Sequence, residues 1–185
     1  MLKDIYKETE IRMKGAIENL EDELSGIRTG RAHPALVEKL NVEYYGVPTP
    51  LVQLATISVP EARSLLIRPF DATTLRAIER GILASDLGLT PNNDGKVIRL
   101  NLPPLTEERR KELVKLVHNR VEEGRVAVRN IRRDMIKTLR EFEEEKLISE
   151  DDLKIGEEEL QKITDRYIEG INSLGDRKEK EILEV

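Results

Sequence analysis

The sequence predicts an α+β protein, in which an elongated antiparallel bundle of three helices carries an inserted small β/α/β domain, the two parts forming the arms of an L. Apolar residues recur at spacings of three and four in long segments near both ends of the chain, as in packed helices. Between about residues 34 and 104 this period disappears and short strand-type segments replace it. The 185 residues suffice for one large domain or two small ones.

The first helix is predicted over residues 2–29. Gly30 should end it, because glycine tolerates the left-handed conformation that is common just after a helix, and Arg28 would then lie in the last turn. The apolar positions that should face the other helices are Met13, Ile17, Leu20, Leu24 and Ile27.

The insert is predicted to contain several short strands and one helix. Strand-type patterns cover residues 41–45, 55–59, 65–68 and 97–102. A helix is expected over residues 73–84, with its buried stripe at Leu75, Ile78, Ile82 and Leu83. Residues 47–50 and 92–95 are rich in Pro, Asn and Gly and are expected to form turns.

The longest helix is predicted from Thr106 to about Leu147 and has two differently marked faces. Its apolar seam consists of Val114, Val117, Val121, Val128, Ile131, Met135, Leu139 and Phe142. A second stripe consists of Arg125, Arg129, Arg132, Arg133 and Arg140. On a helix of 3.6 residues per turn these five arginines project within roughly 100° of one another. We call this stripe the arginine face.

A third helix should open at Ser149, where Ser149 and Asp152 fit a capping box. Three glycines, Gly156, Gly170 and Gly175, each weaken such a helix by about 1 kcal/mol relative to alanine, so it must depend on packing. Its apolar positions are Leu153, Leu160, Ile163, Tyr167, Ile171, Leu174 and Ile182.

This order of elements predicts a discontinuous bundle domain, residues 1–30 and 105–185, and an inserted domain, residues 31–104. Only two short connections join them, so we expect a hinge. The candidate hinge residues are Gly30, Arg31, Pro103, Pro104 and Leu105.

Composition excludes several classes of protein. Cysteine is absent, which fits a reducing cytoplasm, and no apolar run approaches the roughly 20 residues that span a bilayer. The net charge of -5 is unevenly distributed along the chain. Residues 106–140 contain eleven Lys and Arg against six Asp and Glu, which gives this segment a charge of +5. A local basic face, rather than total charge, directs binding to phosphates.

The arginine face has two interpretations from the residues alone. Arginine's planar guanidinium suits the phosphates of folded RNA, which predicts an RNA-binding surface. The alternative is a solvated face paired with acids. Glu122 can pair with Arg125 at i+3, whereas Arg132 and Arg133 have no acid four positions before them.

The sequence shows no residue pattern that indicates catalysis. His33 and His118 are the only histidines and lie far apart, so we expect neither catalysis nor a metal site, and no cofactor. Nucleotide-binding loops and nucleophile elbows are absent. Tyr44 and Tyr45 could offer a ring to RNA, but strand alternation should send one of the two inward, which favours packing within the insert.

The chain resembles the bacterial ribosome recycling factors from its first helix to its C-terminal EILEV. The segments that carry the resemblance are IRTGRAHP at 27–34, VEYYGVPTPLVQLATISV at 42–59, ASDLGLTPNNDG at 84–95, LPPLTEERRKEL at 102–113 and VAVRNIRRD at 126–134. Gly124 and the three glycines of the last helix depart mildly from the pattern, at positions where this fold should accept alanine or a polar residue.

The resemblance implies a non-enzymatic, cytoplasmic translation factor with an outline like that of transfer RNA. Such factors bind the ribosome after termination and, with elongation factor G and its GTP, part the subunits and release messenger and transfer RNA. Their helical arm contacts RNA of the large subunit (23S ribosomal RNA) through arginines that match Arg129, Arg132 and Arg133 here, while the α+β arm meets elongation factor G.

We therefore expect a monomer that binds no membrane, whose RNA contacts include Arg28 as well as the arginine face. The rival hypothesis is an adaptor or chaperone that binds a partner helix through its bundle seam. An adaptor would leave one apolar stripe open, whereas a closed bundle would not.

Overall fold

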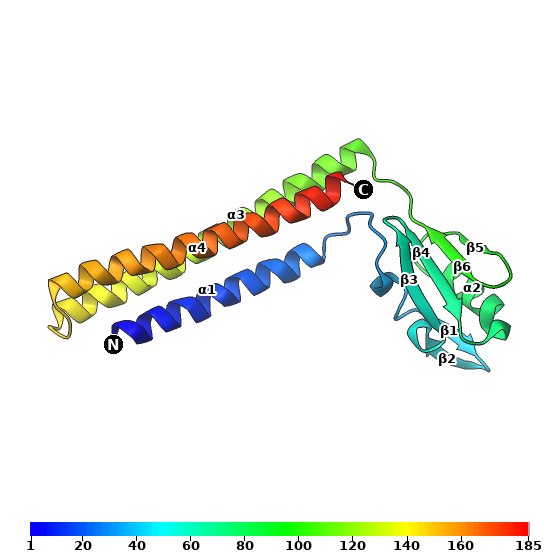
Figure 1. Ribbon diagram of the computed structural model, residues 1–185, viewed down its shortest axis with the longest axis horizontal. Helices are drawn as coiled ribbons and strands as arrows, with labels where there is room; N and C mark the ends of the chain where they lie inside the picture. The colour runs from blue at the N-terminus through cyan, green and yellow to red at the C-terminus, as the bar shows by residue number, and fades with distance from the viewer. Residues whose placement is uncertain (185) are drawn as a thin grey trace. The chain divides into compact units, whose positions relative to one another are not determined.

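The computed structural model describes residues 1–184, which form two compact units (Figure 1). Residues 1–28 and 107–184 form a helical bundle, and residues 29–106 form a unit that contains all of the described strands. Residue 185, the last of the predicted bundle domain, lies outside the described part. Over residues 1–184 no helix combines the length and apolar character needed to cross a membrane.

The bundle contains three long helices, α1 (Leu2–Ser25), α3 (Glu107–Glu144) and α4 (Glu150–Leu183). They lie side by side, and α3 runs in the opposite direction to α1 and α4 (Figure 1). The fully buried side chains include Met13 of α1, Val117 and Leu139 of α3, and Leu160 and Ile171 of α4. Each such side chain contributes about 1.5–3 kcal/mol through its removal from water. The predicted α+β fold with a three-helix bundle is confirmed.

The turn between α3 and α4 is closed by the predicted capping box. The Ser149 hydroxyl accepts a hydrogen bond from the Asp152 backbone N–H at 3.1 Å, and the Asp152 carboxylate accepts one from the Ser149 N–H at 3.1 Å. Two backbone donors that a helix start leaves unpaired are thereby satisfied. The serine hydroxyl also donates to the Asp152 carboxylate, and this bond is the main cause of a lowered pKa of Asp152.

The first helix ends four residues earlier than predicted. Its last residue is Ser25, and Gly26 follows with a right-handed backbone (φ -71°). The N–H of Ile27 bonds to the carbonyl of Leu24, three residues back, which tightens the end of the helix. Gly30 does have a positive φ of 77°, but it lies in the connection after the helix. Arg28 is therefore not in the last turn of α1, and that expectation was wrong.

The second unit contains six strands and a short helix. The strands are β1 (Asn41–Tyr44), β2 (Val47–Pro50), β3 (Ala55–Glu61), β4 (Ser64–Pro69), β5 (Pro91–Asn93) and β6 (Ile98–Asn101), and the helix is α2 (Leu75–Leu83). Four strands form an antiparallel sheet in the order β3-β4-β6-β5, and β1 pairs with β2 in a separate hairpin. Sheet, hairpin and α2 share one core, built on Val42, Leu65, Ile67, Ile78, Ile98 and Leu100.

Residues 47–50, which were predicted as a turn, form strand β2. Of the turn predicted at 92–95, Asn92 and Asn93 belong to β5, whereas Asp94 and Gly95 do form a turn before β6, with Gly95 at a φ of 89°. Both β2 and β5 are edge strands, since β2 pairs only with β1 and β5 only with β6, and proline is tolerated at a sheet edge. The helix also begins later than predicted, after a 3₁₀ turn at Ala72–Thr74, and Leu83 is 59% exposed rather than buried.

The glycines of α4 lie at close helix contacts. A Cβ atom added to Gly175 would lie 2.6 Å from Cγ2 of Val121, and one added to Gly156 would lie 2.8 Å from Cδ1 of Leu139. All four residues are buried. The expectation that alanine would fit is therefore wrong at these two positions, because α3 already fills the space.

We predict that Gly175→Ala destabilises the bundle by about 1–3 kcal/mol, because Val121 has no flexible end that could move aside. The control is Gly15→Ala on α1, where nothing lies within 4 Å of the added methyl group. That change should stabilise the protein by about 0.5–1 kcal/mol through helix propensity. Urea unfolding followed by circular dichroism measures both, and a Gly175→Ala variant as stable as Gly15→Ala would contradict the packing argument.

We also predict a pH signature at the start of α4. Because the folded pKa of Asp152 is lowered by the Ser149 hydroxyl, the carboxylate stabilises the fold above its ordinary pKa of about 3.9. That stabilisation disappears as the pH falls through the lower folded value. Carbon-detected NMR titration should show Asp152 titrating below this ordinary value in the parent protein and returning toward it in Ser149→Ala.

Candidate nucleic-acid interface

The arginine face lies on α3 along its edge with α4. Arg125, Arg129 and Arg132 are partly buried, whereas Arg133 and Arg140 are exposed. The structure therefore brings all five predicted residues onto one helix surface, as the spacing required. None of the five arginines is buried, so none takes part in a buried ion pair.

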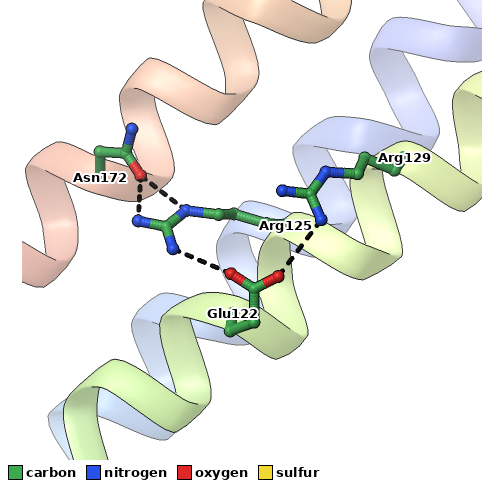
Figure 2. Close-up of polar contacts among 4 residues, drawn as sticks. All are labelled: Glu122, Arg125, Arg129 and Asn172. Atoms are coloured by element: carbon green, nitrogen blue, oxygen red, sulfur yellow. Dashed lines mark hydrogen bonds and ion pairs between the residues drawn. The ribbon is translucent and has the colours of Figure 1, made fainter.

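Glu122 lies within this face and joins two of its arginines (Figure 2). Its carboxylate accepts a hydrogen bond from Nη1 of Arg125 at 2.9 Å and another from Nη1 of Arg129 at 3.2 Å. The predicted i+3 pair of Glu122 with Arg125 is confirmed. These bonds, that from Arg125 first, hold the pKa of Glu122 below its ordinary value, so the carboxylate is ionised near neutral pH.

The other side of Arg125 is held by α4. Nε and Nη2 of Arg125 donate to the same side-chain oxygen of Asn172, at 2.8 and 2.7 Å (Figure 2). Arg125 is thus bonded to a neutral acceptor on one side and to Glu122 on the other. Three polar bonds fix the orientation of its guanidinium.

Two more arginines also meet oxygens of α4. Nη1 of Arg132 donates to the side-chain oxygen of Gln161 at 2.6 Å, and the amide of Gln161 donates in turn to Asp165 at 2.7 Å. Nε and Nη2 of Arg140 donate to one oxygen of Glu157, at 3.1 and 3.0 Å. Arg132 therefore has a neutral direct partner, whereas the charge of Arg140 is compensated.

Sequence reasoning missed these α4 acceptors. As the arginine number rises from Arg125 through Arg132 to Arg140, the partner number falls from Asn172 through Gln161 to Glu157, as antiparallel helices require. The short turn between α3 and α4 was the available signal, because it fixes which residues lie opposite one another.

Arg133 and Arg28 differ from the other predicted RNA contacts. Both are exposed, and within residues 1–184 neither side chain has a hydrogen bond or an ion pair. The guanidinium of Arg133 is therefore available to a ligand. Arg28 follows the end of α1 and is not on α3, the helix that carries the arginine face.

The remaining sequence candidates have structural explanations. His33 accepts a hydrogen bond from the Ala35 N–H at 3.1 Å, and His118 on α3 lies 2.9 Å from Glu179 on α4, which is an interhelix contact. Among the described residues no cluster of acids and histidines could hold a metal ion. Tyr44 packs against the core of the second unit, whereas Tyr45 is 80% exposed at the tip of the β1–β2 hairpin, so one of the two tyrosines points inward, as expected.

Comparison with known proteins assigns a family to the whole chain. The family model described as "Ribosome recycling factor" matches residues 20–183. The ribosome-recycling factor of Syntrophomonas wolfei is 59% identical over 185 residues, and that of Roseiflexus castenholzii is 55% identical, with all of each chain covered in both cases.

Solved structures give the same result. A solution structure of the ribosome recycling factor is 51% identical, has a TM-score of 0.69 and is matched over 100% of this chain and 98% of its own. A second match, with 50% identity, a TM-score of 0.62 and 99% of each chain covered, comes from models of the Thermus thermophilus ribosome recycling factor and the Escherichia coli elongation factor G bound to the E. coli post-termination complex. With this similarity running from end to end, the chain belongs to the ribosome recycling factor family.

Proposed function

We propose that this protein binds the ribosome that remains on messenger RNA after termination and, with elongation factor G and GTP, separates the subunits and releases messenger and transfer RNA. The observation that carries the proposal is similarity over the full chain to ribosome-recycling factors, one of them in models bound to a post-termination complex with elongation factor G. The arginine face is the surface we assign to RNA of the large subunit.

The chemistry of the face suits that partner. Folded RNA presents phosphates and 2′-hydroxyls, and guanidinium groups bind paired phosphate oxygens through two parallel donors. No side-chain partner among residues 1–184 engages the guanidinium of Arg133, and Arg132 has a neutral direct partner, so neither positive charge is paired there with an acid. Arg129 and Arg140 contribute once a phosphate competes with Glu122 or Glu157.

One contact supports the hinge that we propose. Gly30 has a φ of 77°, and a Cβ atom on it would lie only 3.0 Å from Cγ of Leu105, so the two connections of the inserted unit meet at one place. Chain segments that enter and leave a unit at one place restrict its rotation little. We propose that Gly30, Arg31, Pro103, Pro104 and Leu105 let the inserted unit respond to elongation factor G as a second arm with a variable angle.

We further propose that the protein acts in the cytoplasm as a monomer, without a cofactor and without catalytic activity of its own. GTP hydrolysis then belongs to elongation factor G. The adaptor alternative gains no support, because the apolar stripes of α1, α3 and α4 are buried against one another. The exposed apolar residues of the bundle, such as Ile11, Val126 and Ile155, are scattered over three helices.

The decisive functional experiment is light scattering of post-termination ribosomes mixed with this protein, elongation factor G and GTP. We expect scattering to fall as the subunits separate, and to stay constant when either protein or GTP is omitted. Constant scattering in the complete mixture would refute the proposed function.

For the RNA-binding face, we predict that Arg133→Ala and Arg132→Ala each weaken binding to purified large subunits by about 1.5–3 kcal/mol, the value of a hydrogen bond to a charged group. The matched control is Arg166→Ala, which removes the same charge from an arginine that pairs with Glu10 of α1 instead. Equilibrium binding at several salt concentrations measures the effect. The parent should also lose affinity steeply with salt, and each arginine variant should show a shallower slope.

For the hinge, we predict that Gly30→Ala binds large subunits as the parent does but separates subunits more slowly. An L-residue at this positive φ costs about 1–2 kcal/mol, which shifts the connection toward other torsions. Gly88→Ala is the control, since Gly88 also has a positive φ of 64° but lies away from both connections. Equal splitting rates for the two variants, measured by light scattering, would exclude Gly30 from the hinge.

A further inference from the structure

The strongest unexplained feature of the arginine face is the carboxylate inside it. Glu122 accepts hydrogen bonds from two guanidinium groups, at 2.9 Å from Arg125 and 3.2 Å from Arg129, each through a different oxygen (Figure 2). A phosphate that bridged two arginines would present its oxygens in the same way. Glu122 therefore occupies, within the protein, the position of an anionic ligand.

The two arginines depend on Glu122 to different degrees. Arg125 also donates twice to Asn172, so it stays oriented without the carboxylate. For the guanidinium of Arg129, by contrast, Glu122 is the sole hydrogen-bonding partner among residues 1–184. A ligand phosphate can thus take Arg129 from Glu122 while Arg125 keeps the carboxylate in place.

We propose that Glu122 competes with RNA phosphate for Arg129 and so sets the affinity of the arginine face below the value that its arginines alone would give. This inference rests on the proposed function. When RNA binds, Arg129 exchanges a carboxylate for a phosphate, and the ionised Glu122 remains beside the incoming negative charge. Both effects lower affinity and favour release, which suits a factor that must leave the large subunit after each round.

The adjacent residue provides a matched control. Glu123 carries the same charge one position along α3, but its carboxylate pairs with Arg120 at 2.9 Å, and Arg120 in turn lies 3.7 Å from Glu23 of α1. Glu122→Gln and Glu123→Gln therefore change the net charge equally and differ in which arginine they release. Any effect of total charge on RNA binding is common to both variants.

The experiment measures the affinity of the full-length protein for purified large ribosomal subunits by fluorescence anisotropy. The chain has no cysteine, so Lys39→Cys, an exposed position in the inserted unit, allows a single label outside the helical bundle. Glu122→Gln should bind about twofold to fivefold tighter, the range of one exposed ion pair, and should dissociate more slowly. Glu123→Gln should change affinity by less than about 1.5-fold, because its charge lies off the face.

A double-mutant cycle tests whether the effect passes through Arg129. In an Arg129→Gln background, Glu122→Gln should no longer tighten binding, whereas in an Arg133→Gln background the gain should persist. Urea unfolding of each variant shows whether the fold is intact, and a purely structural role for Glu122 would lower stability without slowing dissociation.

Several results would overturn the inference. Equal gains for Glu122→Gln and Glu123→Gln would show an effect of net charge alone, and weaker binding by Glu122→Gln would make the carboxylate an aid to RNA binding. If Glu122→Gln still raised the affinity for large subunits in the Arg129→Gln background, the effect of Glu122 would not depend on Arg129. A parent protein that fails to bind large subunits would refute the proposed function itself, whereas a parent that binds, with no change in Glu122→Gln, refutes only the competition.

Discussion

The close antiparallel packing of α3 against α4 is the constraint on which the core and the arginine face both depend. Gly175 meets Val121 and Gly156 meets Leu139, and in each case the missing side chain lets the helices approach. The arginine contacts follow directly from these points. Arg140 is next to Leu139 and bonds to Glu157, which is next to Gly156, while Asn172 lies one turn before Gly175 and reaches Arg125. One interhelix spacing therefore both buries the apolar seam and determines which guanidinium groups find an oxygen.

The partners of the arginines differ in charge, and this difference affects the positive potential of the arginine face more than the number of partners does. Asn172 and Gln161 are neutral, so they orient Arg125 and Arg132 through hydrogen bonds without cancelling their charge. Glu122 and Glu157 are acidic partners, and each forms an ion pair that lowers the local positive potential. An arginine that is oriented but not neutralised loses less side-chain entropy when it binds a phosphate and still attracts it. The face thus combines pre-oriented and partly neutralised cations.

The features that could be predicted from the sequence are those determined by residues close together along the chain. The helical period placed five arginines on one face of α3, and the Ser149–Asp152 capping box marked the start of α4, because both patterns act within a few residues. Features that depend on tertiary packing were missed. The fit of Gly175 against Val121 cannot be distinguished in sequence from a weak helix position, and β2 and β5 are strands only because a neighbouring strand pairs with them. To predict the acceptors on α4, one must know how α3 and α4 are aligned along each other, and the sequence of neither helix alone gives that alignment.

A surface for a ligand that must later be released cannot simply maximise its positive charge. Each added phosphate contact steepens the dependence on salt and slows dissociation, since most differences in affinity appear in the dissociation rate. The helix α3 carries both an arginine that is free to bind a phosphate and an arginine that is already paired with an acid. Arg133, exposed and without a partner among residues 1–184, is free to bind, whereas Arg129 is already engaged by Glu122 and must exchange one anion for another. Because that exchange would replace an existing ion pair, the RNA contact that we propose for Arg129 would add orientation and shape specificity at a smaller gain in affinity than a free arginine would give.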